Sequence, residues 1–224
     1  MRIVGVVAPG LPPVFSAELD HGVEPERLAR SYGYEIVRPL SVHGPLEEMK
    51  LMMLVKPDPR GARPLRVRKR HIEPGSLPDS EPPKRQRLAA YGILTSELGL
   101  LAVEFSDKTR FFGQWGLPGG GIDDGEKAID AAQREIKEET GQSASKMRLV
   151  DLQTEHWVGR APTGEVEDFQ AVRIVYRGEV LEPGEPQVLE VNGTTSVARW
   201  IPLEGWEDHP WTPAARALLE KHLG

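Results

Sequence analysis

The chain has 224 residues, of which 39% are hydrophobic and 28% are charged, as in an ordinary soluble globular protein. Its length suffices for one full domain and a second, smaller one. Lysine and arginine number 28 against 34 aspartates and glutamates, which gives a formal net charge of −6. This acidic total disfavours nucleic acid as a partner, because a phosphate backbone binds best to a basic surface. Small anionic nucleotides are still candidate ligands, since metal ions can supply positive charge.

The chain contains no cysteine, which excludes disulfides, thiolate metal sites and cysteine nucleophiles. Its first residues, MRIVGVVAPGLPPVF, lack the charged start and long apolar run of a signal peptide. The apolar stretch from Leu51 to Val55 is far too short to cross a bilayer. We therefore expect a cytoplasmic enzyme with no membrane partner.

Residues 1–60 predict a small α+β unit with a β-α-β-β pattern. Its β-branched and amphipathic runs are, in chain order, Arg2–Ala8, Glu24–Ser31, Tyr34–Leu40 and Met49–Lys56.

Residues 61–85 predict a linker, because repeated prolines break any long regular element and stiffen the chain. This region also holds the basic run from Arg66 to Arg70. We favour a solvated strand edge for this run over a phosphate-binding patch, since charge runs are usually solvated.

Residues 86–224 predict a second domain with paired strands and two helices. The helix at Gly125–Thr140 has Asp123 or Asp124 available as N-cap and Gly141 as its stop. Strands that pair as hairpins, mixed with helices, indicate a mixed sheet covered on both faces. The remaining expected elements are strands at Leu88–Thr95, Leu100–Phe105, Met147–Val158, Asp168–Val180 and Ala198–Ile201, and a helix at Pro213–His222.

The helix after residue 125 carries an acidic cluster. Glu135, Glu138 and Glu139 stand at i, i+3 and i+4, so their carboxylates project from one face. Such like charges repel, so the cluster is tolerable on a solvated surface or where a cation neutralises it. Carboxylates without histidine or cysteine suit Mg²⁺ or Mn²⁺. Ile129, Ala132 and Ile136 form the adjoining apolar stripe, which we expect to pack on the sheet.

Three glycines, Gly119 to Gly121, precede this helix and let the backbone approach a ligand closely. A glutamate-rich helix alone is usually a solvated face, and a glycine run alone is usually a turn. Their spacing together favours a site where metal ions bridge carboxylates and a diphosphate, activate water and stabilise the leaving oxygen.

The segment from Gly119 to Gly141 resembles the box of the Nudix hydrolase family: a glycine, five residues, a glutamate, seven residues, and Arg-Glu-apolar-x-Glu-Glu-x-Gly-apolar. One position departs from this pattern: Gln142 stands where the family usually has an aliphatic residue. The departure puts in doubt the packing of this position against the sheet. The resemblance covers about residues 86–224 and implies a Nudix-like α/β/α sandwich beside the N-terminal β-α-β-β unit. The matching positions are Gly120, Glu126, Arg134, Glu135, Ile136, Glu138, Glu139 and Gly141.

The resemblance also implies roles. Glu135, Glu138, Glu139 and the backbone carbonyl of Gly119 would be metal ligands, with Mg²⁺ or Mn²⁺ as cofactor. Glu135 would also act as a base toward the attacking water. Arg134 would orient the Glu135 carboxylate, and Glu126 would support the site at its edge. Family members often use a further acidic residue from another loop. The candidates here are Glu165, Glu167 and Asp168. The alternative is that these three are ordinary polar loop residues.

The expected activity is metal-dependent cleavage of a diphosphate linkage in a nucleoside triphosphate or a nucleotide conjugate such as ADP-ribose. The alternative is a catalytically weak Nudix-like nucleotide sensor. Downstream residues Glu155–Val158 carry neither the proline typical of ADP-ribose enzymes nor the tyrosine typical of dinucleoside polyphosphate enzymes. Trp115, Trp157 and Tyr176 are candidates for base stacking, although strand aromatics are more often core. A homodimer also stays open, since unpaired strand edges are natural interfaces.

Overall fold

The computed structural model describes residues 1–65, 71–73, 81–161 and 164–224. The basic run at 66–70 and residues 74–80 of the expected linker lie outside this described part, so the interpretation of that run stays a prediction. The chain divides into two compact units, each built from three segments. The first contains Met1–Ala89, Gly121–Ala128 and Leu149–Ile174, and the second contains Ala90–Gly120, Ile129–Arg148 and Val175–Gly224.

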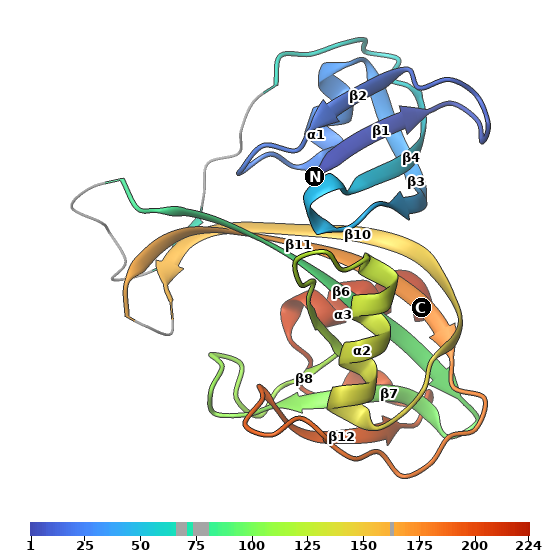
Figure 1. The fold of residues 1–224 in the computed structure, drawn as a ribbon, viewed down its shortest axis with the longest axis vertical. Coiled ribbons are helices and arrows are strands. Elements are labelled where there is room, and N and C mark those ends of the chain that lie inside the picture. The colour runs from blue at the N-terminus through green and yellow to red at the C-terminus, as the bar shows by residue number, and fades with distance from the viewer. Residues whose placement is uncertain (66–70, 74–80, 162–163) are drawn as a thin grey trace. The chain divides into compact units, whose positions relative to one another are not determined.

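The N-terminal part of the first unit forms a four-stranded sheet with strand order β2-β1-β4-β3 (Figure 1). β1 pairs parallel with β4, whereas β2 and β3 pair antiparallel with their neighbours. The expected β-α-β-β elements are present, and the structure adds β2, which is too short to give a clear sequence pattern. The elements are β1 (Arg2–Val6), β2 (Phe15–Glu18), α1 (Pro25–Ser31), β3 (Tyr34–His43), a 3-10 turn (Leu46–Glu48) and β4 (Lys50–Pro57).

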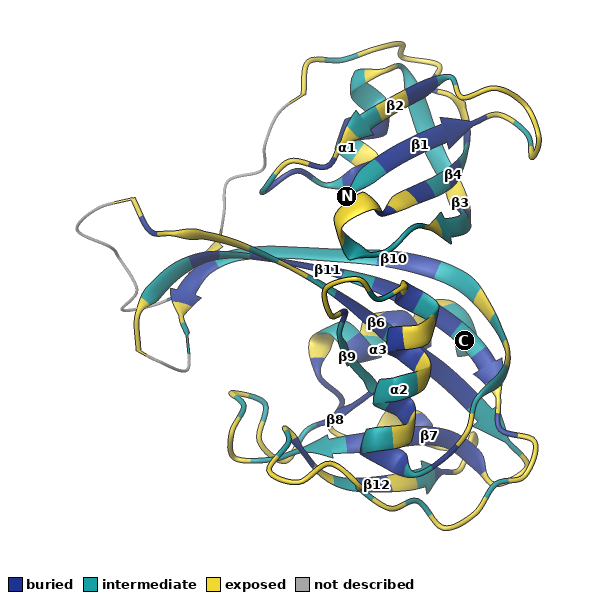
Figure 2. Ribbon diagram, viewed as in Figure 1, coloured by how far each residue is buried: buried dark blue, intermediate teal, exposed yellow. Residues whose placement is uncertain are grey.

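Alternating side chains bury one face of this small sheet. In β4, Leu51, Met53 and Val55 are buried while the residues between them are more exposed (Figure 2). β1 is buried along most of its length, as expected of a strand with neighbours on both sides. The register of β3 shifts between Ile36 and Arg38 and again between Pro39 and Ser41. Pro39 has no N–H to donate to the ladder.

The later chain forms a second sheet with strand order β12-β7-β6-β11-β10-β5, with β8 on β7 and β9 on β6. β10 and β5 pair parallel while β12–β7 and β6–β7 pair antiparallel, so the predicted mixed sheet is confirmed. In Figure 1, α2 lies in front of these strands and α3 behind them. The elements are β5 (His71–Ile72), β6 (Lys84–Ser96), β7 (Gly99–Phe105), β8 (Trp115–Gly116), β9 (Gly119–Gly121), α2 (Ala128–Thr140), β10 (Ser145–Arg160), β11 (Val166–Glu179), β12 (Thr195–Ile201), a 3-10 turn (Trp206–Asp208) and α3 (Pro213–Leu223).

Helix α2 packs on β6 through small residues. A Cβ atom at Gly92 would lie 3.0 Å from Cδ1 of Ile136, so the glycine allows the helix to approach the strand closely. Ala132 and Ile136 are fully buried, as the sequence predicts. The stripe is completed by Ala131 rather than Ile129, which is half-buried.

The predicted start of α2 was wrong by three residues. The helix begins at Ala128 because Asp123 and Glu126 close a turn, in which the Glu126 N–H donates to the Asp123 carbonyl at 3.0 Å. Gly125 within this turn has a positive φ of 78°, which is not helical, so neither Asp123 nor Asp124 caps the helix. The predicted stop at Gly141 is confirmed, since its φ is 68° and its N–H donates to the Lys137 carbonyl.

Gln142, the departure from the box pattern, is buried and hydrogen-bonded. Its Oε1 accepts a 3.1 Å hydrogen bond from the N–H of Gly184, and its Nε2 lies 3.5 Å from the Thr140 carbonyl. The amide therefore fills the position of an aliphatic side chain while fixing the loop that follows β11.

Within the first unit, the loop between β2 and α1 is joined to later strands by the buried amide of Gln170. Its Oε1 accepts hydrogen bonds from the Gly22 N–H (2.8 Å) and from Gln86 Nε2 (2.9 Å), and its Nε2 donates to the Val23 carbonyl (2.9 Å). A buried amide with its hydrogen bonds made fixes local geometry, because leaving any partner unpaired is costly. The division into domains at residues 1–60 and 86–224 stays a prediction.

Among the described residues, none of the helices has both the length and the apolar character needed to cross a membrane.

Asp58 fixes the chain that follows β4. Its Oδ1 accepts the N–H of Arg60 at 2.9 Å, and its Oδ2 pairs with Arg63, whose own N–H donates to the Arg30 carbonyl of α1. The Arg60 N–H bond and the two guanidinium groups lower the pKa of Asp58 from 3.8 to about 2 against the opposing effect of burial.

We expect Asp58→Asn to lower the melting temperature at neutral pH. A folded-state pKa below the unfolded one stabilises the fold above pH 4, and this contribution is lost as pH falls toward 2. The melting-temperature difference from the wild type should therefore narrow below pH 4. Asp107→Asn, at an exposed loop position, serves as the control. A difference that stays constant between pH 6 and 3 (roughly the usable range) would contradict this role.

Candidate functional site

The acidic face of α2 is held together by one arginine. Nη1 of Arg134 donates to Glu135 Oε1 at 2.9 Å and to Glu138 Oε2 at 3.2 Å. The guanidinium thus bridges two carboxylates of like charge and offsets their repulsion. Glu135 is 16% exposed and Glu138 is 43% exposed, so Glu138 has the greater access to solvent.

Glu139, the third carboxylate, is only 3% exposed. Its Oε2 accepts the N–H of Gly119 at 2.8 Å, and its Oε1 accepts the hydroxyl of Thr195 at 2.5 Å. Within the described part of the chain, no lysine or arginine forms an ion pair with this buried carboxylate. The glycine loop, α2 and β12 therefore meet at this side chain.

Burial changes the acidity of two of these groups. Desolvation raises the pKa of Glu139 from 4.5 to about 7, although the hydrogen bonds from Thr195 and Gly119 favour the charged form. Desolvation also raises the pKa of Glu135, against the opposing effect of Arg134. The sequence suggests ordinary carboxylates that are weak bases near neutral pH, whereas the structure shows environments that make both groups more basic.

Two of the loop glycines are required by close neighbours. A Cβ at Gly120 would lie 2.5 Å from Cδ of Glu135, so any side chain there would displace that carboxylate. Gly119 has a φ of 144°, and a Cβ there would lie 2.3 Å from the carbonyl oxygen of Ala90. Glycine at both positions lets the backbone approach the acidic face of α2.

Glu126, the remaining acidic position of the box, lies in the turn that precedes α2. Its Oε2 accepts the N–H of Asp123 at 3.1 Å, and its carbonyl accepts the N–H of Leu46 at 3.0 Å. Its observed contacts thus stabilise the turn, and its expected supporting role at the metal site stays a prediction.

Two of the three loop acids considered as a further metal ligand pair with other residues, and the third is exposed. Asp168 is buried and accepts from His21 and His156, and Glu167 pairs with Arg85 at 3.3 Å. Glu165 is exposed.

Sequence reasoning missed two residues near the box, Thr195 and Glu190. The charge of Glu190 raises the pKa of both Glu135 and Glu139. Glu190 is brought there because its N–H donates to the Glu138 carbonyl at 3.0 Å, at the end of α2. Neither residue belongs to a motif, and contacts so distant in sequence left no signal.

The candidate stacking aromatics lie mainly in the core. Trp115 and Tyr176 are 7% and 6% exposed. Trp157 is half-buried, and its ring centroid lies 4.8 Å from that of Phe169. The core interpretation is therefore favoured for Trp115 and Tyr176.

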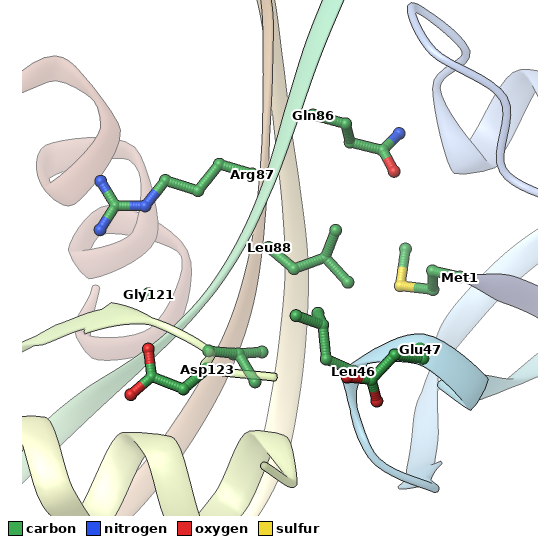
Figure 3. Close-up of a pocket in the computed structure, with 9 residues that line it drawn as sticks. Met1, Leu46, Glu47, Gln86, Arg87, Leu88, Gly121 and Asp123 are labelled. Atoms are coloured by element: carbon green, nitrogen blue, oxygen red, sulfur yellow. The ribbon is translucent and has the colours of Figure 1, made fainter. Parts of the chain in front are cut away.

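The first unit contains a pocket of about 470 Å³, large enough for a small organic ligand. Figure 3 shows Leu88 and Leu46 at its centre, with Arg87 and Asp123 extending to one side. Its wall includes the loop residues that follow Gly120 directly in the chain, together with residues from the N-terminal segment. The lining residues are Met1, Leu46, Glu47, Gln86, Arg87, Leu88, Gly121, Ile122 and Asp123.

The residues of the box fit a hard divalent cation. The ligand atoms on offer are carboxylate oxygens and a backbone carbonyl, which Mg²⁺ and Mn²⁺ prefer. A carboxylate has about four lone-pair positions, so the two hydrogen bonds on Glu139 leave others available. The absence of an ion-paired cation at Glu139 within the described residues, together with the raised pKa, means that a bound cation would stabilise its charged form.

A mixed sheet with a glycine loop leading into a carboxylate-bearing helix is the arrangement expected of a Nudix domain. The model of the NUDIX domain family matches residues 85–222, which is more than half of the chain. The chain therefore belongs to the NUDIX domain family.

Curated relatives match over shorter segments. A nucleoside triphosphatase NudI of Escherichia fergusonii is 40% identical over 58 residues, which are 25% of this chain and 41% of the relative. An RNA pyrophosphohydrolase of Erythrobacter litoralis is 34% identical over 89 residues, which are 34% of this chain and 54% of the relative. The chain thus spans about half or less of the length of these relatives.

Among solved structures, the chain is similar to Nudix proteins. A MutT NUDIX hydrolase from Burkholderia pseudomallei gives a TM-score of 0.48 at 28% identity, covering 62% of this chain and 98% of that one. The NUDIX domain of Shewanella oneidensis NrtR, complexed with ADP ribose, gives 0.48 at 23% identity, covering 66% and 90%.

We expect Gly120→Ala to weaken Mn²⁺ binding by roughly 10- to 100-fold, because the new Cβ would displace the Glu135 carboxylate. Electron paramagnetic resonance of free Mn²⁺ measures this affinity. The matched control is Gly184→Ala, where the nearest atom to the new Cβ would be Gln142 Nε2 at 3.9 Å. Equal Mn²⁺ affinities in the two folded variants would show that the close contact at Gly120 does not matter.

Proposed function

We propose that this protein is a divalent-metal-dependent pyrophosphohydrolase that cleaves a diphosphate linkage in a nucleotide derivative. The observation that carries the proposal is the buried Glu139 carboxylate, which lies beside Glu135 on α2 with no cation paired to it among the described residues. A purely structural helix has no reason to bury such a charge, because burial without a counter-ion is costly.

In this proposal Glu135, Glu138, Glu139 and the Gly119 carbonyl hold Mg²⁺ or Mn²⁺. When bound, the cation supplies charge shielding for the diphosphate and activates water. Arg134 holds the carboxylates of Glu135 and Glu138 in place through its two hydrogen bonds. Glu135, whose pKa burial raises, accepts a proton from the attacking water.

Glu190 is our candidate for an additional acid at this centre. Its N–H donates to the Glu138 carbonyl at 3.0 Å, and its charge raises the pKa of both Glu135 and Glu139. Glu165, Glu167 and Asp168 stay the candidates that the sequence offers for this part.

The substrate class is a nucleoside triphosphate or a nucleotide conjugate such as ADP-ribose. Attack of water on a diphosphate linkage gives two phosphate-bearing products, so their masses identify both the substrate and the bond that breaks. The relatives named as triphosphatase and RNA pyrophosphohydrolase, and the structure complexed with ADP ribose, support testing both classes. A homodimer and a cytoplasmic location stay predictions from the sequence.

The alternative function is a nucleotide sensor with weak catalysis. The complete set of box carboxylates favours the hydrolase, because a sensor need not retain every one of them. A sensor would bind a nucleotide without releasing products, which the same mass analysis detects.

Hydrolysis should vanish with EDTA and return with Mg²⁺ or Mn²⁺. Glu139→Gln should lower the rate on the order of 10²-fold or more, because it removes a ligand charge. Its fold should survive, since the Thr195 hydroxyl can accept from the new amide while the Gly119 N–H still donates to the remaining oxygen.

The control for this experiment is Glu220→Gln on the exposed face of α3, which should leave the rate unchanged. Full activity of rigorously metal-free enzyme, or near-normal turnover by folded Glu139→Gln, would show that the site is elsewhere.

We also propose that the pocket lined by Leu46 and Leu88 influences substrate choice. Leu46→Trp would fill part of its volume, so we expect KM to change for some nucleotides more than for others, with little change in the melting temperature. Leu98→Trp, at a position 47% exposed in the turn after β6, is the matched control. Unchanged KM values for every accepted substrate would show that the pocket does not influence substrate choice.

A further inference from the structure

A second cluster of metal-ligating side chains lies in the first unit and is not part of the Nudix box. His21 lies in the loop between β2 and α1, His156 on β10 and Asp168 on β11. One ligating atom from each residue lies within 4.8 Å of the others. Both Nε2 atoms point at the same oxygen: Asp168 Oδ1 lies 2.6 Å from His156 and 3.1 Å from His21.

The cluster is largely shielded from water. The side chain of Asp168 is 2% exposed, and those of His21 and His156 are 17% and 15% exposed. Burying a carboxylate is costly unless polar or charged groups surround it. A cation at the point where the three atoms converge would be one such group.

The spacing suits a small tetrahedral ion. Bonds of about 2.0 Å in a tetrahedral site place neighbouring ligand atoms about 3.3 Å apart. The His21–Asp168 distance of 3.1 Å is already close to this spacing. The His156–Asp168 distance of 2.6 Å would open by about 0.7 Å, a shift that a side-chain rotation can supply.

We propose that His21, His156 and Asp168 bind a transition-metal ion of the zinc class, with water in the fourth position. Two imidazole nitrogens and one carboxylate oxygen form a set that zinc accepts, unlike the all-oxygen set of the box. The site is structural: the ion joins the loop at His21 to strands β10 and β11 and so clips the N-terminal segment to the later chain.

The surrounding backbone holds the loop ready for this ion. Gln170, two residues after Asp168 on β11, accepts the N–H of Gly22 and donates to the carbonyl of Val23. His21 is therefore positioned by hydrogen bonds made by its own chain neighbours. Such prior ordering strengthens metal binding, because less conformational freedom is lost when the ion binds.

The competing arrangement holds no ion: both imidazoles donate Nε2–H to Asp168 Oδ1. The buried Nδ1 of His21, which has no hydrogen-bond partner among the described residues, lacks one in either arrangement and so favours neither. Metal titration separates the two arrangements.

The test uses the full chain carrying Glu139→Gln, stripped with EDTA, so that the box contributes little to metal binding. Co²⁺ in a tetrahedral nitrogen and oxygen site gives strong visible absorption, whereas octahedral Co²⁺ absorbs weakly. We expect strong absorption that saturates at one equivalent of Co²⁺ and is abolished by Zn²⁺. Zn²⁺ at a hundredfold excess over its Kd should shift the folded-to-unfolded ratio about 100-fold.

His21→Gln and His156→Gln in the same background should lose the absorption and the Zn²⁺ stabilisation, whereas His43→Gln, at an exposed position on β3, should retain both. Absorption that persists in the folded His21→Gln variant would overturn the proposal. If the histidine variants do not fold, the parent decides: a stripped Glu139→Gln protein that gives no tetrahedral Co²⁺ absorption binds no ion at this cluster. Either result leaves the proposed hydrolase untouched, because that activity depends on the box.

Discussion

The burial of the Glu139 carboxylate is the constraint on which the rest of the site depends. Its two oxygens are held by the Gly119 N–H and the Thr195 hydroxyl, so the side chain fixes the glycine loop and β12 against α2. These dipoles partly stabilise the charge, yet burial still raises the pKa to about 7. A divalent cation bound here would stabilise the charged form of Glu139, which burial disfavours. A carboxyl group whose pKa is shifted in this way is typical of functional sites.

The glycine loop and the helix constrain each other through space rather than through sequence propensity. Gly120 leaves room for the Glu135 carboxylate, and Gly92 leaves room for Ile136 on the adjoining face of the helix. The acidic face is thereby pressed toward the loop while the apolar face is pressed onto β6. A helix so fixed holds its carboxylates at defined positions, which matters because small displacements of a catalytic group cost large factors in rate.

The sequence predicted most of the fold, and it singled out Gly119 and Glu139, which the structure joins by a hydrogen bond. Period-two and helical patterns located the long strands and α2, and Gly141 was recognised as a helix stop because a positive φ favours glycine there. The start of α2 was misjudged because the turn at Asp123–Glu126 depends on specific hydrogen bonds rather than on propensity. Thr195 and Glu190 were missed because they approach α2 only through tertiary contacts. The clustering of His21 with His156 and Asp168 was likewise invisible, since it joins segments more than a hundred residues apart.

Anomalous diffraction from crystals soaked in Mn²⁺ tests most directly whether the carboxylates of α2 bind a divalent cation. We expect a manganese peak within coordination distance of the carboxylates of Glu135, Glu138 or Glu139 and of the Gly119 carbonyl. Crystals that show manganese bound elsewhere, with the Glu139 carboxylate still held only by Gly119 and Thr195, would contradict it.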